Sequence, residues 1–297
     1  MPITREQWIE VESVVDEFWD MKMKEKKDFN AMLYNVQDSD KSQENHLGIG
    51  ALGQMSPWKG TVSYQEFVKG FDKGYRHAKY SSGIQFEEEI FRFNEYNKIE
   101  QRSRQLLDAV YKTLQAHGVS TFNNAFDDTF AGPDEVALCA DDHPYSPTDS
   151  STQSNAFDLS LTMANLKTVF NAMTQFKDDK GDLIFVMPNV LLTGIEYREE
   201  AMKICGPKAS NLEPFTGDND ANIYGDMTYI YHPLITGKKW FLIDKDLMAN
   251  YLYWYNARVP KIATDGDFDT EVMKFKVVGM WSYGFDTWPW IAGSNAD

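Results

Sequence analysis

The chain has 297 residues, of which 42% are hydrophobic and 14% aromatic, and its formal net charge is −16. This apolar content excludes a chain that is disordered throughout. The 45 acidic against 29 basic residues disfavour tight binding of nucleic acid, which needs a basic surface to neutralise phosphates. Two cysteines, Cys139 and Cys205, are too few for a disulfide framework, and no apolar run is long enough to cross a membrane.

The first predicted element is an amphipathic helix that begins near Thr4. Its apolar residues, which include Trp8 and Trp19, recur every three or four positions, and charged residues lie between them. Such a helix serves either as part of a core or as an arm that docks on a neighbouring subunit. The pattern leaves both interpretations open.

A glycine-rich segment follows from Gly48 to Phe86. It holds seven of the chain's 19 glycines and several aromatic residues, and stretches such as 61–64 and 75–80 alternate weakly, as β-strands do. Strands interrupted by glycine cannot bury both faces by themselves. The pattern predicts an extended hairpin that protrudes and pairs with a partner chain, with a small flap as the alternative.

The longest periodic stretch runs from Phe86 to His117. Its apolar residues follow steps of three, four and seven, which is the helical period, and Gly118 supplies the expected stop. About 32 residues at about 1.5 Å each make a rod of roughly 48 Å. We predict a long spine helix that carries one domain along its length.

The second half of the chain mixes helices and strands. A helix capped by Ser160 is predicted, then a strand from Leu183 to Met187 and a shorter helix from Ile195 to Ile204. The remainder is predicted to be rich in strands. These strands cover residues 227–232, 239–244, 251–255 and 272–283.

No catalytic, cofactor-binding or metal-binding residue is predicted. The cluster Asp141-Asp142-His143 has no second histidine at ligand spacing and favours a turn. Residues 218–220 only loosely resemble a calcium loop and are interpreted as a surface loop. The sequence contains no Gly-x-Ser-x-Gly, phosphate-binding glycine loop or His-Glu-x-x-His motif.

The aromatic run from Tyr251 to Tyr255 offers one alternative function. Alternating aromatics can stack on a sugar, as in a lectin or a carbohydrate-active enzyme. However, no pair of carboxylates accompanies this run in a general acid and base role. Aromatic residues that alternate on a strand more often belong to a core, so the carbohydrate function is the less favoured interpretation.

Short motifs of the second half occur in a characteristic order. They are His143-Pro144, Ser151–Asn155, Met187–Gly194, Tyr231–Leu234, Lys239–Asp244 and Trp288–Ala296. In this order, and preceded by residues 74–80 leading into the spine helix, they resemble the major capsid proteins of tailed phages. These proteins have the Hong Kong 97-type fold. In detail, the motifs resemble those of the Mu-like major head subunits.

The resemblance implies an α+β fold in which a peripheral and an α/β axial domain follow an arm and an extended β-hairpin loop. The implied divisions, in chain order, are an N-terminal arm at 1–47, an extended loop at 48–85, a peripheral domain with the spine helix at 86–153, a mainly axial domain at 154–284, and a C-terminal segment at 285–297 that returns to the peripheral domain.

The implied function is a subunit that assembles through pentamers and hexamers into an icosahedral shell around phage double-stranded DNA. Aromatic residues often anchor interfaces, and most of the candidates for contacts between subunits lie in the arm or the loop. These candidates are Trp8, Trp19, Trp58, Tyr64, Phe67, Phe71, Tyr75, Arg76 and Tyr80.

The resemblance also implies partners and a location. Portal, scaffold or decoration proteins would accompany the shell, DNA would lie nearby without tight binding, and assembly would take place in the host bacterial cytoplasm before the subunit joins the virion. No cofactor, enzymatic activity or membrane partner is implied. The alternative within the same fold is an encapsulin-like compartment that holds cargo enzymes.

Overall fold

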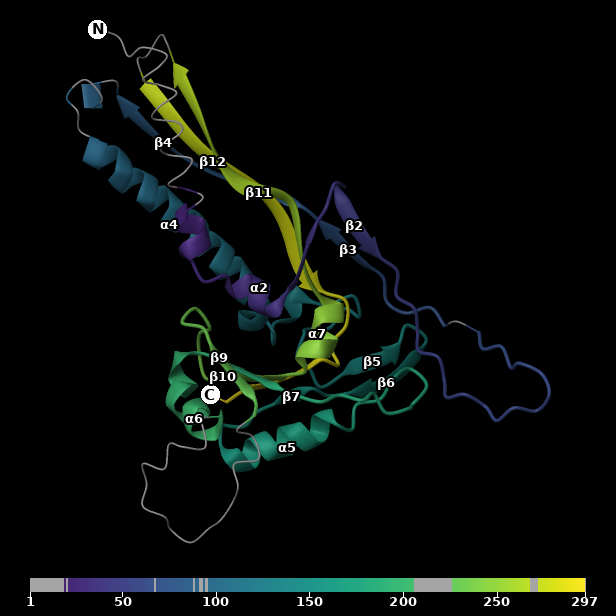
Figure 1. The fold of residues 1–297 in the computed structure, drawn as a ribbon. Coiled ribbons are helices and arrows are strands. Elements are labelled where there is room, and N and C mark those ends of the chain that lie inside the picture. Colours follow the sequence, from purple (N-terminus) through teal and green to yellow (C-terminus); the bar gives the residue numbers. More distant parts are fainter. Residues whose placement is uncertain are drawn as a thin grey trace, which may run out of the picture.

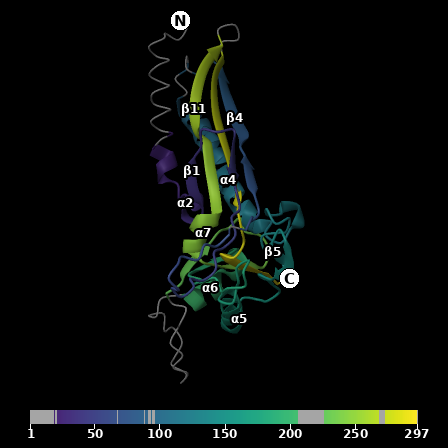
Figure 2. The same ribbon diagram turned by 90° about the vertical axis from the view of Figure 1, so that its right-hand side faces the viewer.

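The computed structural model describes residues 19, 21–66, 68–87, 89–90, 93, 96–205, 226–267 and 272–296. The molecule has an elongated part, in which long strands run beside one long helix, and a compact part built around a second sheet (Figure 1). Seen from the side, the long strands continue from the compact part to the far end of the elongated part (Figure 2).

A four-stranded sheet forms the elongated part, in the order β1-β11-β12-β4. The strands are β1 (Asn35–Asp38), β4 (Ala78–Glu87), β11 (Leu252–Asp267) and β12 (Val272–Phe285). β11 and β12 are antiparallel, and their register shifts between Asn256 and Lys261. Pro260 lies in this irregular stretch, where a residue without a backbone donor is tolerated.

The long helix α4 (Tyr96–Asn123) lies along this sheet. Ile99 packs against Phe86 and Phe275, and farther along the helix Leu106 and Leu107 pack with Trp19 and Val277. The helical stripe that periodicity predicts is therefore confirmed over α4. Its apolar face covers the four-stranded sheet.

The predicted start of the spine helix at Phe86 is wrong. Phe86 belongs to β4, and its ring meets the ring of Phe275 on β12 edge to face at 5.4 Å. Cross-strand aromatic pairing of this kind stabilises a sheet. The end is also different, because α4 continues through Gly118 to Asn123.

Gly118 is an internal helix residue that lets α2 (Phe29–Leu33) approach. A Cβ atom at Gly118 would lie 1.7 Å from Oδ1 of Asn30, the residue whose amide donates to Leu114 O. We expect Gly118→Ala to lower the free energy of unfolding by about 1–3 kcal/mol through overpacking. Urea denaturation measures this change, and Gly53→Ala, at a more open position, is the control.

The same substitution should change sign when Asn30 is truncated. In an Asn30→Ala background the clash is gone, and alanine then favours the helix by up to about 1 kcal/mol relative to glycine. A Gly118→Ala substitution that destabilises both backgrounds equally would contradict the steric explanation.

His117 links α4 to the long sheet. The indole Nε1 of Trp281 donates to His117 Nδ1 at 3.1 Å, and burial lowers the pKa of His117 below its ordinary value. The folded state therefore binds this proton less readily than the unfolded chain. The contribution of His117 to the free energy of unfolding is therefore fully present above the unfolded pKa of about 6.5. It is lost as the pH drops through that value.

We expect His117→Gln to remove part of this pH dependence. Glutamine keeps a hydrogen-bond acceptor but does not titrate, so the variant should lose less stability than the original chain between pH 7 and pH 5.5. Denaturation at several pH values measures the difference. Identical pH slopes in the two proteins would show that His117 does not contribute.

A five-stranded sheet forms the compact part, in the order β7-β13-β10-β8-β9. The central strand β10 (Lys239–Ile243) is flanked by β8 and β13, and its residues 240–243 are fully buried. The other strands are β7 (Ala156–Phe157), β8 (Val190–Thr193), β9 (Thr228–Tyr231) and β13 (Ile291–Asn295).

The remaining helices are α5 (Met163–Met173), α6 (Arg198–Cys205) and α7 (Lys245–Tyr251), with the short helices η1 (Asp128–Phe130) and η2 (Ile195–Tyr197). α5 and α6 contact the five-stranded sheet, and α7 contacts β1 and β11 of the long sheet. The N-cap of α5 is Thr162, whose hydroxyl accepts from the backbone N of Asn165, so the prediction of Ser160 as the cap is wrong. Ser160 instead accepts the Asn165 side chain through its carbonyl.

Two short hairpins complete the described fold. One pairs β2 (Gln43–His46) with β3 (Lys73–Arg76), and the other pairs β5 (His143–Ser146) with β6 (Asp149–Gln153). No described helix is long and apolar enough to cross a membrane.

Strand pairing groups the chain differently from the predicted divisions. β11 and most of β12, expected in the axial segment 154–284, pair with each other and with β1 and β4. β13, expected to return to the peripheral part, pairs with β10 and β7. Sequence order alone could not show these pairings, and the division into domains stays a prediction.

Candidate functional site

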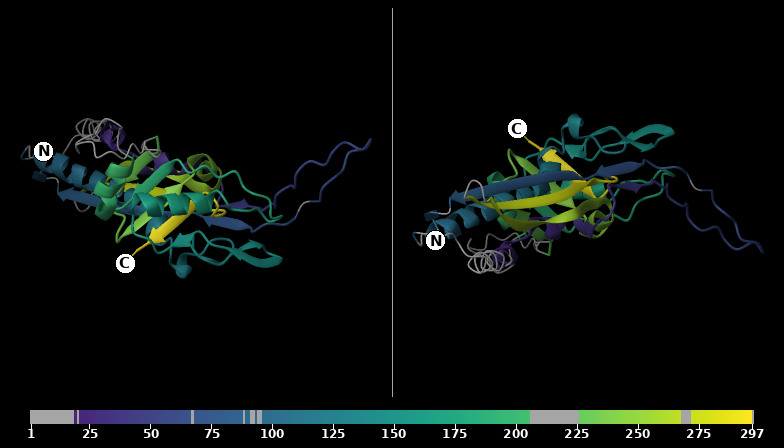
Figure 3. Two further views of the ribbon diagram at one scale, coloured as in Figure 1. Left: turned by 90° about the horizontal axis from the view of Figure 1, so that it is seen from below. Right: turned by 90° about the horizontal axis from the view of Figure 1, so that it is seen from above.

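The most prominent feature outside the two sheets is an arm, residues 47–72, that leaves the body between β2 and β3 (Figure 1). The views along the vertical axis show it extending far beyond the rest of the chain (Figure 3). Its base is a short antiparallel pair, in which Gly50 N donates to Val68 O at 2.8 Å and Gly70 N donates to Gly48 O at 2.9 Å. We call residues 47–72 the arm from here on.

The predicted β-hairpin is confirmed in part, because residues 75–80 lie on β3 and β4 and the two limbs of the arm pair at their base. Beyond it, residues 51–66 form no strand, and the two limbs are joined through Gln65, whose side chain bonds to both the N and the O of Gly53. The limbs lie too far from other strands to complete a ladder, so the arm protrudes without the support of a sheet.

Two glycines at the base are required by close contacts. A Cβ atom at Gly48 would lie 2.3 Å from Phe71 O, and one at Gly50 would lie 2.2 Å from Asp179 Oδ2. Only glycine lets the two limbs and the body approach this closely. The packing of the base therefore accounts for the glycines at positions 48 and 50.

A turn of the compact part, residues 177–182, forms hydrogen bonds with both limbs of the arm. Asp179 Oδ1 accepts from the backbone N of Ala51 at 2.9 Å, and Asp182 Oδ1 accepts from Gln54 Nε2 at 3.3 Å. Lys180 Nζ donates to Gln65 Oε1 at 3.3 Å. These bonds join residues more than one hundred positions apart and fix the direction in which the arm leaves.

A second set of bonds fixes the stem of the arm at its other side. Asp286 accepts from His46 Nδ1 at 2.6 Å and from the Tyr75 hydroxyl at 2.5 Å, and the Tyr255 hydroxyl bonds to His46 Nε2 at 2.7 Å. Burial, and next the charge of Asp286, raise the pKa of Tyr75, so its hydroxyl remains a donor at all ordinary pH values.

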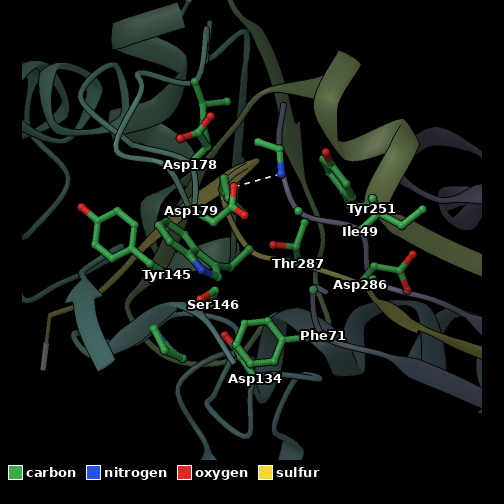
Figure 4. Close-up of a pocket in the computed structure, with 18 of the residues that line it drawn as sticks. Ile49, Phe71, Asp134, Tyr145, Ser146, Asp178, Asp179, Tyr251, Asp286 and Thr287 are labelled. Carbon is green, nitrogen blue, oxygen red and sulfur yellow. Dashed lines mark hydrogen bonds between the residues drawn. The ribbon is translucent and has the colours of Figure 1, made fainter. Parts of the chain in front are cut away.

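A cavity of about 430 Å³ lies between the arm base and the compact part (Figure 4). Ile49 and Phe71 line it from the arm, and Tyr145, Asp179 and Asp286 line it from the body. The arm is therefore joined to the body through polar contacts around a hollow rather than through a continuous apolar core. Within the described residues, no three His, Cys, Asp or Glu side chains gather as a metal site.

The outer arm exposes large apolar side chains. Met55 is 96% exposed, Tyr64 is 91% exposed and Trp58 is 73% exposed. An extended apolar surface of this size is unusual on a protein that works alone and marks an interaction site. Five further apolar side chains of the arm are exposed and were not among the predicted contact residues: Leu47, Ile49, Leu52, Met55 and Val62.

The residues predicted to contact other subunits fall into three groups. Trp58, Tyr64 and Arg76 are exposed, and Phe71 is half-buried at the cavity. Trp19, Tyr75 and Tyr80 pack within their own chain, Tyr80 by stacking on Trp281 at 4.3 Å. Trp8 and Phe67 lie outside the described residues, as does the predicted surface loop at 218–220.

The aromatic run at 251–255 does not form a sugar platform around Trp254. Trp254 is buried, and its ring stacks on Tyr283 at 5.2 Å and on Trp281 at 6.1 Å. The carbohydrate hypothesis needs this ring at the surface. The alternation of aromatic residues instead serves the packing of β11 against β12.

His143 belongs to a buried network instead of the predicted turn. It begins β5, and its Nδ1 bonds to Asp134 Oδ2 at 2.7 Å while its Nε2 bonds to Asn155 Oδ1 at 3.1 Å. Its ring stacks on Trp288 at 4.6 Å. Its carboxylate partner is therefore Asp134, nine residues earlier, and not one of the adjacent residues Asp141 and Asp142.

A scan against protein families matches residues 70–288, more than half of the chain, to the family described as "Phage capsid protein". A search of curated proteins finds no match.

Three solved phage structures have a similar fold at low sequence identity. The procapsid of bacteriophage JBD30 has a TM-score of 0.59 and 11% identity, over 99% of this chain and 77% of that chain. The capsid of cyanophage P-SCSP1u has a TM-score of 0.58 and 10% identity, over 89% and 86%. A structure from Microbacterium phage Oxtober96 has a TM-score of 0.54 and 12% identity, over 92% of both chains.

Proposed function

The chain belongs to the phage capsid protein family, and we propose that the shell it forms is icosahedral and is built from pentamers and hexamers around double-stranded DNA. As a major capsid protein it is a structural component of the virion and assembles with its own copies. The predicted capsid fold is confirmed by these neighbours, and the Hong Kong 97-type description is consistent with them.

The arm is the observation that carries the proposal. It exposes Trp58 and Tyr64, has no sheet of its own beyond the base, and is aimed away from the body by bonds from both sides. An arm of this kind gains its apolar contacts by lying across the next copy. Trp58 and Tyr64 are therefore the strongest of the proposed contact residues, with Arg76 beside the stem.

The two sheets are consistent with two domains that have different positions in the shell. The five-stranded sheet and its helices suit an axial domain that meets its copies around a symmetry axis. The long sheet with α4 suits a peripheral domain that spans toward the next capsomer.

The charge supports a shell that holds DNA without adhering to it. With a formal net charge of −16, the average surface repels phosphate, so packaged DNA can lie against it without tight binding. Portal, scaffold or decoration proteins as partners, a non-enzymatic role and assembly in the host cytoplasm belong to the same proposal. The encapsulin-like alternative is not favoured by the family match.

Size-exclusion chromatography followed by negative-stain electron microscopy tests the proposal. We expect closed shells, or free pentamers and hexamers, in the earliest fraction. A protein that stays a 34.1 kDa monomer under all assembly conditions would contradict the proposed function.

A further inference from the structure

A row of three large apolar side chains follows directly after the turn that holds the arm. Leu183, Phe185 and Met187 are 50%, 93% and 76% exposed. The residues between them point inward, with Ile184 at the cavity and Val186 in the core. The segment forms only an isolated bridge, between Leu183 and Lys177, so the strand that the sequence predicts here is not part of a ladder.

This row, which we call the 183–187 row, has no intrachain explanation. The alternation of a strand places one apolar set in the core, and the other set lies on the surface. Phe185, at 93%, is slightly more exposed than Tyr64 in the arm, at 91%. A surface with three such side chains in succession marks an interaction site.

A second apolar surface lies on the other side of the compact part. Ile195 of η2, Met202 of α6 and Tyr231 of β9 are each about half exposed, and the Arg198 guanidinium lies over the Tyr231 ring at 5.1 Å. We call these residues the α6–β9 patch. Figure 1 shows α6 and β9 on one side of the compact part, and the arm leaves on the opposite side.

Ring symmetry relates these two surfaces. A closed ring of identical copies uses heterologous contacts, so one side of each copy meets the opposite side of the next. The 183–187 row begins at the turn whose Asp179 and Asp182 hold the arm, which places the row on the arm side. The copy that faces this side presents its own α6 and β9.

We propose that the 183–187 row of one copy packs against the α6–β9 patch of the next copy around the capsomer. This inference rests on the proposed function, and it assigns a second contact that is separate from the arm. An aromatic side chain buries about 150–250 Å². Two of the six side chains, Phe185 and Tyr231, are aromatic, so the six side chains cover only part of the ~1,600 Å² that a standard interface buries, and the arm supplies further area.

Disulfide trapping between single-cysteine variants tests the contact. A tagged Phe185→Cys chain and an untagged Met202→Cys chain, both carrying Cys205→Ser, are mixed as dissociated subunits, assembled and oxidised. Cys139 is buried and stays unreactive. We expect a heterodimer on non-reducing gels. The control pairs Phe185→Cys with Val259→Cys, an exposed position on β11, and should give at least tenfold less product.

Three results would overturn the inference. Normal shells without a Phe185–Met202 heterodimer would reject this contact while the proposed function stands. A heterodimer between Phe185→Cys and Tyr64→Cys in place of Met202→Cys would show that the neighbour's arm covers the row. If the original chain forms neither shells nor rings, the proposed function itself fails.

Substitution of the row provides an independent readout. Phe185→Ser should leave the thermal midpoint of the isolated subunit within about 2 °C, because the side chain is almost fully exposed, and should abolish or strongly reduce ring formation. Phe130→Ser, at an exposed aromatic residue of η1, is the matched control and should assemble normally. Equal assembly of the two variants would contradict the proposed contact.

Discussion

Replacing residues 52–66 of the arm with a short Gly-Ser linker should abolish shell assembly and leave the body folded. The replaced residues include Met55, Trp58 and Tyr64, which contribute almost nothing to the intrachain core because they are largely exposed. Their expected effect on the free energy of unfolding is therefore small, within about 1 kcal/mol. The loss falls on contacts that exist only between copies.

Three measurements separate assembly from folding in this variant. Light scattering after size exclusion gives the assembly state, electron microscopy shows whether shells form, and urea denaturation gives the stability. The double variant Trp58→Ser and Tyr64→Ser, which keeps the arm's length, should be intermediate. If the variant with the shortened arm forms shells in normal yield, the arm is not an assembly element.

Asn155→Ala should be the most destabilising single substitution considered for the compact part. Asn155 is fully buried, its Nδ2 donates to Leu138 O and Ile291 O, and its Oδ1 accepts from Ala140 N. Truncation leaves three backbone groups without partners, each at a cost of about 1–3 kcal/mol. We expect a loss of roughly 3–5 kcal/mol in the free energy of unfolding.

The matched control is Asn165→Ala on α5. Its amide is exposed and makes one side-chain bond to Ser160 O, so the expected loss is about 1 kcal/mol or less. Chemical denaturation of both variants gives the comparison. Equal losses would contradict the view that Asn155 ties the 138–140 segment to the C-terminal strand.

The helical repeat in the sequence correctly predicted the apolar faces of two helices. The stripe of α4 and the apolar face of α5 follow the helical repeat and were found where it placed them. Phe86 fits both the helical stripe and the alternation of β4, and its pairing with Phe275, 189 positions later, decides in favour of the strand. No local pattern carries that information.

The candidate site was predicted in outline and missed in detail for the same reason. Glycine and aromatic content located the arm, and Trp58 and Tyr64 are exposed as a contact surface requires. The bonds that aim the arm, from Asp179 to Ala51 and from Asp286 to His46, connect distant parts of the chain. The sequence predicts a strand at 183–187 but not its exposed row, because alternation shows which residues share a face and does not show which face is covered.

The irregular register between β11 and β12 has a mechanical consequence. Bulges bend the strands that contain them, and here the bend lies between Asn256 and Lys261, close to where the long sheet leaves the compact part. The six residues of β11 beyond it, 262–267, extend roughly 20 Å. A change of about 10° at this joint would displace the far end by about 3.5 Å. In the proposed icosahedral shell, such a change would let one sequence follow both the sharper curvature at a five-fold vertex and the flatter curvature of a facet.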